Sequence, residues 1–248
     1  MTEDIRVMRD GALVEVRMNR PSKKNALTDA MYGAMADALI TAGQDPEVKA
    51  VLISAEGDVF TAGNDLSDFA AAGSRPTSDV PRGAKRFLHA IATAEKPLIA
   101  AVTGHCVGIG TTMLLHCDVV IIAEDARLTT PFTSLGVTPE AASSLLLPAR
   151  IGHLRAFMML ALGQSIGGVE AARLGIATEA LPRGEVDARA RAVAKECCAR
   201  PAEAMRITKM LMRDAGAVTE RIDQEAGYFR ERVKSPEAQA AFAAFFSR

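Results

Sequence analysis

The spacing of apolar and polar positions changes from strand-like to helical within the first part of the chain. Residues 5–9 and 13–18 are short β-prone segments, and Asp10-Gly11 between them favours a tight turn. Thr28 is a residue type that caps helices, and Gly43 is one that ends them. Between these two, apolar residues recur at helical spacing, at Met31, Met35, Ala38 and Leu39. We expect a hairpin and then a helix that stops at Gly43.

Short apolar runs follow at three places, with helix-compatible sequence before and between them. These runs are residues 50–54, 98–102 and 119–122. Continuous apolar strands that alternate with helical segments are typical of a largely parallel sheet with helical crossovers. The sequence therefore predicts an α/β fold.

After Leu181-Pro182 the pattern is helical almost to the end of the chain. Helices are expected near residues 185–198, 202–214 and 219–233, then a last turn or two carrying Phe242, Phe245 and Phe246. Helices with this much apolar surface need a neighbour, either the core of the protein or another subunit. We predict a core of residues 1–182 and a C-terminal helical region of residues 183–248.

Composition and charge exclude several classes of partner. The 248 residues include 29 Lys plus Arg and 30 Asp plus Glu, and the net charge of −1 gives no reason to expect nucleic acid. The four cysteines lack the spacing of a zinc site or a redox dithiol, and we expect no metal. The acidic start of the chain is unlike a secretory leader, and the apolar runs are too short to cross a bilayer. We therefore expect a cytoplasmic protein without a membrane partner.

Two segments of small residues are the candidate chemistry of the chain. Residues 60–66 and 101–110 each place small residues where a strand-like run ends, so that backbone N–H groups can approach a ligand closely. Two such loops can converge on one oxygen, and each donor aimed at a developing oxyanion contributes about 3 kcal/mol. Residues 67–83 are rich in small and helix-breaking residues, and we predict a mobile loop there that borders the site.

The two segments belong to a longer ordered pattern. They are preceded by Asn19-Arg20-Pro21 and Asn25-Ala26-Leu27 and followed by Cys117-Asp118. In this order, from about Val14 to Leu181, the chain closely resembles the crotonase family, the enoyl-CoA hydratase/isomerase superfamily. The resemblance implies a spiral of ββα units with a helical C-terminal region that builds homotrimers, often paired into hexamers. It also implies an acyl-CoA thioester as substrate, with coenzyme A part of that substrate and no separate cofactor.

The resemblance assigns roles to individual residues. The backbone N–H groups of Asn64 and Ile109 would hold the thioester oxygen, and Phe132 and Leu135 would line the acyl pocket. The implied contacts to coenzyme A are Lys24, Ala26, Ala62, Gly63, Asp65, Leu66 and Gly110.

The acid/base group separates the possible reactions. The two glutamates that enoyl-CoA hydratases use match Thr112 and Phe132 here, and neither exchanges a proton at neutral pH. Residues 132–144 resemble instead the corresponding stretch of the peroxisomal type of Δ3,Δ2-enoyl-CoA isomerase, where a glutamate at the position of Glu140 moves a proton between carbons 2 and 4. That pattern usually has two glycines after the glutamate, whereas this chain has Ala141-Ala142. We expect Glu140 at a helix start, where burial raises its pKa and the helix N-terminus lowers it.

The sequence favours an isomerase that converts a 3-enoyl-CoA to a 2-enoyl-CoA, with Glu140 as proton shuttle. Two alternatives stay open: an enoyl-CoA hydratase with a different base, and an acyl-CoA-binding family member that has lost the reaction. A glutamate in a first helical turn also interacts favourably with the helix dipole without any catalytic role. Asp65 and Asp118 are expected to brace loops, His105 to pack or hydrogen-bond a loop, and Cys106 to pack.

Overall fold

The core is a six-stranded sheet, and the computed structural model describes residues 3–65 and 82–246. Its strands are β1 (Ile5–Asp10), β2 (Leu13–Met18), β3 (Ala50–Ala55), β4 (Leu98–Val102), β6 (Val119–Ala123) and β9 (Glu179–Leu181), in the spatial order β1-β2-β3-β4-β6-β9. The β1–β2 pair is antiparallel and every other pair is parallel. The predicted hairpin and largely parallel sheet are confirmed.

A smaller sheet stands beside the first. It contains β5 (His105–Val107), β7 (Arg127–Thr129) and β8 (Ile166–Gly167), with β5 and β7 parallel and β7 and β8 antiparallel. Strand β5 belongs to the second small-residue segment, so this sheet holds one of the two candidate loops.

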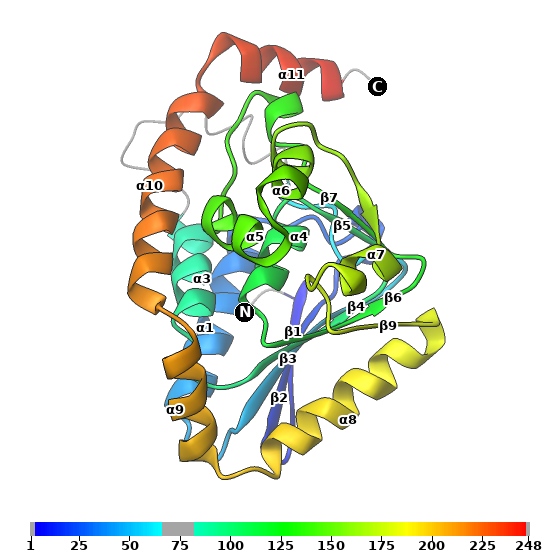
Figure 1. The fold of residues 1–248 in the computed structure, drawn as a ribbon, viewed down its shortest axis with the longest axis vertical. Coiled ribbons are helices and arrows are strands. Elements are labelled where there is room, and N and C mark those ends of the chain that lie inside the picture. Colours follow the sequence, from blue (N-terminus) through cyan, green and yellow to red (C-terminus); the bar gives the residue numbers. More distant parts are fainter. Residues whose placement is uncertain (1–2, 66–81, 247–248) are drawn as a thin grey trace.

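Helices cover both faces of the large sheet. Figure 1 shows α1 (Asp29–Gln44) and α3 (Arg82–Ala92) together on one side and α8 (Val186–Cys198) on the other. The remaining helices are α4 (Ile109–Thr112), α5 (Ser143–Ile151), α6 (His153–Leu160), α7 (Gly168–Arg173), α9 (Ala202–Met212), α10 (Ala215–Val233) and α11 (Pro236–Phe246), with 3-10 turns η1 (Pro21–Lys23), η3 (Met113–His116), η4 (Thr133–Leu135) and η5 (Arg183–Glu185). Because the sheet is covered on both sides, all five residues of β4 are buried.

The first helix begins as expected but ends later. Thr28 caps α1, and its hydroxyl accepts a hydrogen bond from the N–H of Met31 at 3.3 Å. The predicted stop at Gly43 is wrong, since α1 continues to Gln44. Glycine costs about 1 kcal/mol inside a helix, which is too little to end one whose preceding residue, Ala42, is packed in the core.

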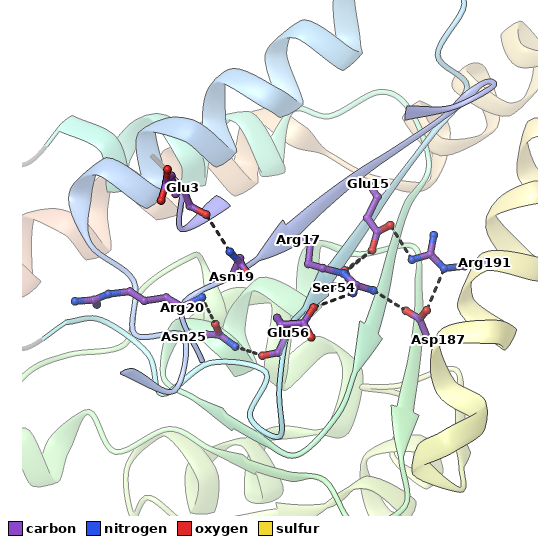
Figure 2. Close-up of polar contacts among 10 residues, drawn as sticks. All are labelled: Glu3, Glu15, Arg17, Asn19, Arg20, Asn25, Ser54, Glu56, Asp187 and Arg191. Atoms are coloured by element: carbon purple, nitrogen blue, oxygen red, sulfur yellow. Dashed lines mark hydrogen bonds and ion pairs between the residues drawn. The ribbon is translucent and has the colours of Figure 1, made fainter. Parts of the chain in front are cut away.

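An ionic network centred on the buried Glu15 joins α8 to the sheet (Figure 2). The carboxylate of Glu15 on β2 accepts hydrogen bonds from the hydroxyl of Ser54 at 2.6 Å and from Arg191 of α8 at 2.7 Å. Arg17 joins Glu15 to Asp187 of α8. Burial raises the pKa of Glu15, but the Ser54 and Arg191 hydrogen bonds outweigh it and hold that pKa below the ordinary value. The network fixes α8 against the sheet face.

The C-terminal segment is helical as predicted, with α11 as a complete helix beyond the three expected ones. α8 packs on strands β3, β4 and β6, so the first helix after residue 182 forms part of the same core. The division into residues 1–182 and 183–248 stays a prediction. In the described part of the chain, no helix is both long enough and apolar enough to span a bilayer.

Candidate active site

The two small-residue loops lie against each other. The N–H of Thr61 donates to the carbonyl of His105 at 3.2 Å, and the N–H of Val107 donates back to the carbonyl of Thr61 at 3.0 Å. These bonds form a parallel bridge between Thr61 and Cys106. Segments that are far apart in the sequence therefore meet as neighbouring backbones.

Glycine makes this close approach possible at two points. A Cβ atom on Gly63, whose φ is +91°, would lie 2.9 Å from the carbonyl oxygen of Val107. A Cβ atom on Gly110 would lie 2.5 Å from the Cγ2 atom of Thr61. Neither position accepts a side chain without movement of the opposite loop.

In the part of the chain that the structure describes, each loop presents one backbone amide without a hydrogen-bond partner. The N–H of Leu27 donates to the carbonyl of Gly63, and the carbonyl of Leu27 accepts from the N–H of Asp65. The N–H of Asn64, which lies between Gly63 and Asp65, takes part in neither bond. The N–H of Ile109 begins α4, where the first amides of a helix have no partner within it. Within residues 3–65 and 82–246, neither the Asn64 nor the Ile109 amide donates to another group. The residues that the structure describes therefore leave both amides open to an external oxygen.

The segment before the first loop is held by a buried asparagine (Figure 2). The side chain of Asn25 accepts from the N–H of Arg20 at 2.8 Å and donates to the carbonyls of Glu56 and Val59 at 2.9 and 2.8 Å. Asn25 and the preceding Lys24 both have left-handed backbones, with φ of 53° and 52°. This turn fixes Lys24 on the surface.

The two aspartates expected to brace loops do so. Asp65 pairs with Arg20 at 2.7 Å, which ties the first loop to the segment before it. Asp118 accepts from the N–H of Leu98 at 2.7 Å and pairs with Lys209 of α9 at 2.7 Å. Structural bonds therefore occupy both carboxylates.

The expected coenzyme A contacts lie along these loops. Lys24 is exposed, Ala26 and Ala62 are partly exposed, and Gly63 and Gly110 are buried where the loops touch. Leu66 and most of the predicted mobile loop at 67–83 lie outside the described residues, while residues 82–83 begin α3. Coenzyme A binding by this set stays a prediction.

Glu140 lies beside the second loop. The hydroxyl of Thr112 donates to Oε1 of Glu140 at 2.6 Å, and Thr112 lies three residues after Ile109, on the same face of α4. At the first loop, the hydroxyl of Tyr32 donates to the side-chain oxygen of Asn64. Burial and then the charge of Glu140 raise the pKa of Tyr32. A carboxylate, two open amides and a tyrosine hydroxyl are thus gathered in one place.

The surroundings of Glu140 change its proton affinity. Burial is the main cause that raises the pKa of Glu140 to about 8; the hydrogen bond from Thr112 opposes this rise, and the like charge of Glu225 adds to it. A carboxyl with a pKa near neutrality both accepts and returns a proton readily. The predicted rise by burial is thus present, and the cause that opposes it is the Thr112 hydrogen bond rather than the expected helix N-terminus.

The turn that carries Glu140 differs from the expectation. The helix α5 begins at Ser143, so Glu140 lies before it and not in its first turn. The helix dipole therefore does not explain this glutamate. Ala141 and Ala142, both buried, have left-handed φ angles of 60° and 54°. The chain thus keeps the backbone that glycine adopts most easily, although it carries alanine at both positions.

Other side chains near the loops have structural roles. The side chain of His105 is exposed, so the expectation that it packs is wrong, although its carbonyl does bond the first loop. Burial raises the pKa of Cys106, which is the state of a packing residue and not of a nucleophile. Phe132 is buried and Leu135 is half-buried against the core, and their place in an acyl pocket stays a prediction. Among the described residues, no three His, Cys, Asp or Glu side chains are grouped to hold a metal ion.

Sequence reasoning missed Tyr32 and Glu225. Tyr32 contacts a residue 32 positions away, and Glu225 contacts one 83 positions away. The helical period correctly marks Tyr32 as a residue of a helix, but it does not reveal which side chain the hydroxyl meets.

Known proteins are similar to this chain in sequence. Residues 8–248 match the profile of the family described as enoyl-CoA hydratase/isomerase. Enoyl-CoA delta isomerase 2 of Rattus norvegicus is 34% identical over 255 residues, which cover 100% of this chain and 64% of the rat protein. A probable enoyl-CoA hydratase of Rhodobacter capsulatus is 34% identical over 79% of this chain and 76% of its own length.

The fold also matches a solved structure. OdaA of Pseudomonas aeruginosa superimposes with a TM-score of 0.94 at 43% identity, and the match covers 100% of both chains. This chain spans somewhat less than two thirds of the length of the rat relative. With the profile match over nearly its whole length, the chain belongs to the enoyl-CoA hydratase/isomerase family, the crotonase superfamily.

Proposed function

We propose that the protein is an enoyl-CoA isomerase that moves the double bond of a 3-enoyl-CoA to carbon 2. The observation that carries the proposal is Glu140, hydrogen-bonded to Thr112 next to the Ile109 amide, with burial raising its pKa to about 8. The similarity to the rat delta isomerase supports the same reaction class.

The chemistry needs one base and one oxyanion site. Ionised Glu140 removes a proton from carbon 2, and the electron pair moves onto the thioester oxygen. The amides of Asn64 and Ile109 stabilise that enolate oxygen. The thioester carbonyl then re-forms, and the electron pair between carbons 1 and 2 becomes the double bond between carbons 2 and 3. The electron pair of the former double bond between carbons 3 and 4 takes the same proton from Glu140 at carbon 4. No water is consumed, and Glu140 ends in its starting state.

Hydration is less well supported by these residues. It needs groups that position and activate a water, and the positions expected for them hold the buried Thr112 and Phe132. The hydroxyl of Thr112 already donates to Glu140. The relative named as a probable hydratase makes this reaction the main competing outcome.

We further propose that the protein acts in the cytoplasm as a homotrimer or a hexamer of paired trimers. Large apolar side chains are exposed on α6, just after α6 and on α9, namely Leu154, Phe157, Leu162, Met210, Leu211 and Met212. Such groups support burial against another subunit. Light scattering on the purified protein tests the assembly, and a monomer at micromolar concentration would contradict it.

The reaction is tested with two substrates and one variant. Purified protein and Glu140→Gln are assayed separately with 3-hexenoyl-CoA and crotonyl-CoA, following 2-enoyl-CoA and 3-hydroxyacyl-CoA formation. We expect isomerisation by the wild type, loss of it in the variant, and negligible hydration by either. Brisk hydration by both proteins would place the base elsewhere. No turnover of either substrate, together with tight acyl-CoA binding, would favour the non-catalytic alternative.

A further inference from the structure

The turn that carries Glu140 is fastened by a carboxylate from a distant helix. Glu225 of α10 is only 6% exposed, and it accepts from the N–H of Ala142 at 2.6 Å and from the N–H of Ser144 at 3.0 Å. In Figure 1, α10 runs past the side of the molecule where α3 and α5 lie. Glu225 thus caps the start of α5 from another element, because both donors belong to amides without partners inside the helix.

The same turn is held from its opposite side by a buried histidine. Nε2 of His116 lies 2.7 Å from the carbonyl oxygen of Ala141, and Nδ1 lies 2.5 Å from the Arg213 guanidinium. A carbonyl only accepts and a guanidinium only donates, so the ring is neutral with its proton on Nε2. Burial first, and then Arg213, lower the pKa of His116 to about 3, which agrees with this state.

The turn needs such support because its own residues do not favour it. A left-handed backbone costs an L-residue roughly 1 to 2 kcal/mol, and here Ala141 and Ala142 adopt it in succession. Two alanines of this kind would relax to other conformations in a free peptide. The contacts from Glu225 and His116 select the conformation that directs Glu140 toward Thr112.

In the part of the chain that the structure describes, the turn is faced by titratable groups of α10, α1 and η3, and the η3 histidine is itself bound by Arg213. Glu140 interacts with Glu225 of α10 and with Tyr32 of α1. Glu225 in turn interacts with Arg221 on its own helix. His116 on η3 is neutral. Glu225 therefore acts in two ways. Its two accepted hydrogen bonds hold the turn, and its negative charge raises the pKa of Glu140.

We propose that Glu225 is a positioning residue for proton transfer, because its carboxylate fixes the Ala141-Ala142 turn and so aims the Glu140 side chain at the substrate. This inference rests on the proposed role of Glu140 as the proton shuttle. It also means that the site is incomplete without α10, which belongs to the predicted C-terminal region.

Three substitutions separate the effects of side-chain length, side-chain charge and folding. Glu225→Gln keeps the length but removes the charge, and its amide NH₂ group faces one of the two N–H donors. Glu225→Asp keeps the charge but is one methylene shorter. Glu220→Gln is the matched control, because it makes the same chemical change at an exposed residue of the same helix. Each variant is assayed for isomerisation across pH, and its thermal unfolding is recorded.

The expected results differ between the three. Glu225→Gln lowers kcat by about tenfold to a hundredfold with little change in KM, since Glu140 is misplaced rather than substrate binding lost. Its pH profile of kcat/KM moves to lower pH by roughly half a unit to one unit, because a like charge has been removed from beside Glu140. Glu225→Asp lowers kcat but keeps the wild-type midpoint. Glu220→Gln matches the wild type in both.

Some outcomes would overturn the inference. A Glu225→Gln enzyme that keeps wild-type kcat and pH midpoint shows that Glu225 does not position the base. Lower thermal stability with unchanged kinetics would show that Glu225 is structural only. If Glu225→Gln does not fold, the Glu225→Asp enzyme decides alone, and a wild-type kcat there contradicts the proposal.

A direct titration distinguishes failure of this inference from failure of the proposed function. Carbon-13 NMR of protein labelled at the glutamate carboxyl groups, with Glu140→Gln used for assignment, reports the Glu140 titration without any substrate. If the wild type shows no turnover, the proposed function fails. A downward shift of the Glu140 midpoint in Glu225→Gln would still support the influence of Glu225 on Glu140. An unchanged Glu140 midpoint in that experiment would refute the influence of Glu225 on Glu140, whatever the reaction is.

Discussion

The two loops that offer amides and the turn that carries Glu140 reach their geometry by different means. In the loops, Gly63 and Gly110 stand where a side chain would collide with the opposite backbone or side chain. In the turn, Ala141 and Ala142 hold left-handed conformations that alanine does not favour. The loops are shaped by residues within them, and the turn by hydrogen bonds that come from α10 and η3.

This difference shows where each part of the site is encoded. Close approach between backbones requires the absence of a Cβ atom, so a local glycine pattern predicts it. The direction of a carboxylate depends instead on which partners meet its turn after folding. A chain can therefore keep a left-handed turn in place without local glycines when distant side chains such as Glu225 bond its backbone.

The largest effect is expected where the loops touch. Gly110→Ala places a Cβ atom 2.5 Å from the Thr61 side chain, so the loops must separate and the Asn64 and Ile109 amides lose their common target. We expect kcat/KM for 3-hexenoyl-CoA to fall by about a hundredfold to a thousandfold, as for loss of one oxyanion donor. Steady-state kinetics at fixed pH measure this.

The control for that substitution is Gly43→Ala near the end of α1. Gly43 is exposed, and its added Cβ atom would meet nothing within 4 Å. Activity should be unchanged, and the free energy of unfolding should rise by about 0.5 to 1 kcal/mol because alanine favours the helix. Equal activity in the Gly110→Ala enzyme would show that the loops tolerate separation.

These contrasts also explain what the sequence could predict. The apolar runs identified the strands because a sheet covered on both faces needs continuous apolar segments, and the small-residue segments identified both loops. Gly43 was misjudged because core packing of Ala42 outweighs a weak local preference. The Tyr32–Asn64 and Glu225–Ala142 contacts could not be predicted, since they depend on how separate helices dock.

A second prediction concerns the stability of the Glu140 site. The pKa of Glu140 is raised from 4.5 to about 8 by burial, so the folded state holds a proton that the unfolded state releases between these values. Stability therefore falls as pH rises through this window. Glutamine does not titrate, so Glu140→Gln should gain about 2 to 4 kcal/mol in unfolding free energy above pH 8 and much less at pH 5.

Urea unfolding at pH 5 and pH 9 measures this difference. The exposed Glu220→Gln variant is the control and should show no such pH dependence relative to the wild type. An equal effect of Glu140→Gln at both pH values would mean that the carboxyl titrates normally in the folded protein.

A third prediction isolates the hydrogen bond from Thr112. This bond favours the charged form of Glu140, so Thr112→Val should raise the pKa of Glu140 above about 8 and move the rising limb of the kcat/KM profile to higher pH. At pH 7 the rate should fall about tenfold, and it should recover partly in alkaline buffer. Thr208→Val, at an exposed position on α9, should leave the profile unchanged. A midpoint that stays in place in Thr112→Val would exclude this hydrogen bond as a control on the base.

The smallest effect should come from restoring glycine to the turn. Ala141→Gly combined with Ala142→Gly removes roughly 1 to 2 kcal/mol of left-handed strain per residue, and added freedom of the unfolded chain offsets about 0.5 to 1 kcal/mol of that at each position. Because Glu225 and His116 bond the backbone of this turn and not its methyl groups, Glu140 should keep its direction, with kcat/KM within about threefold of the wild type. Kinetics and thermal unfolding of the double variant measure both quantities. A large loss of kcat would show that the buried methyl groups themselves hold the base, and the turn would then resemble the loops in being shaped by its own residues.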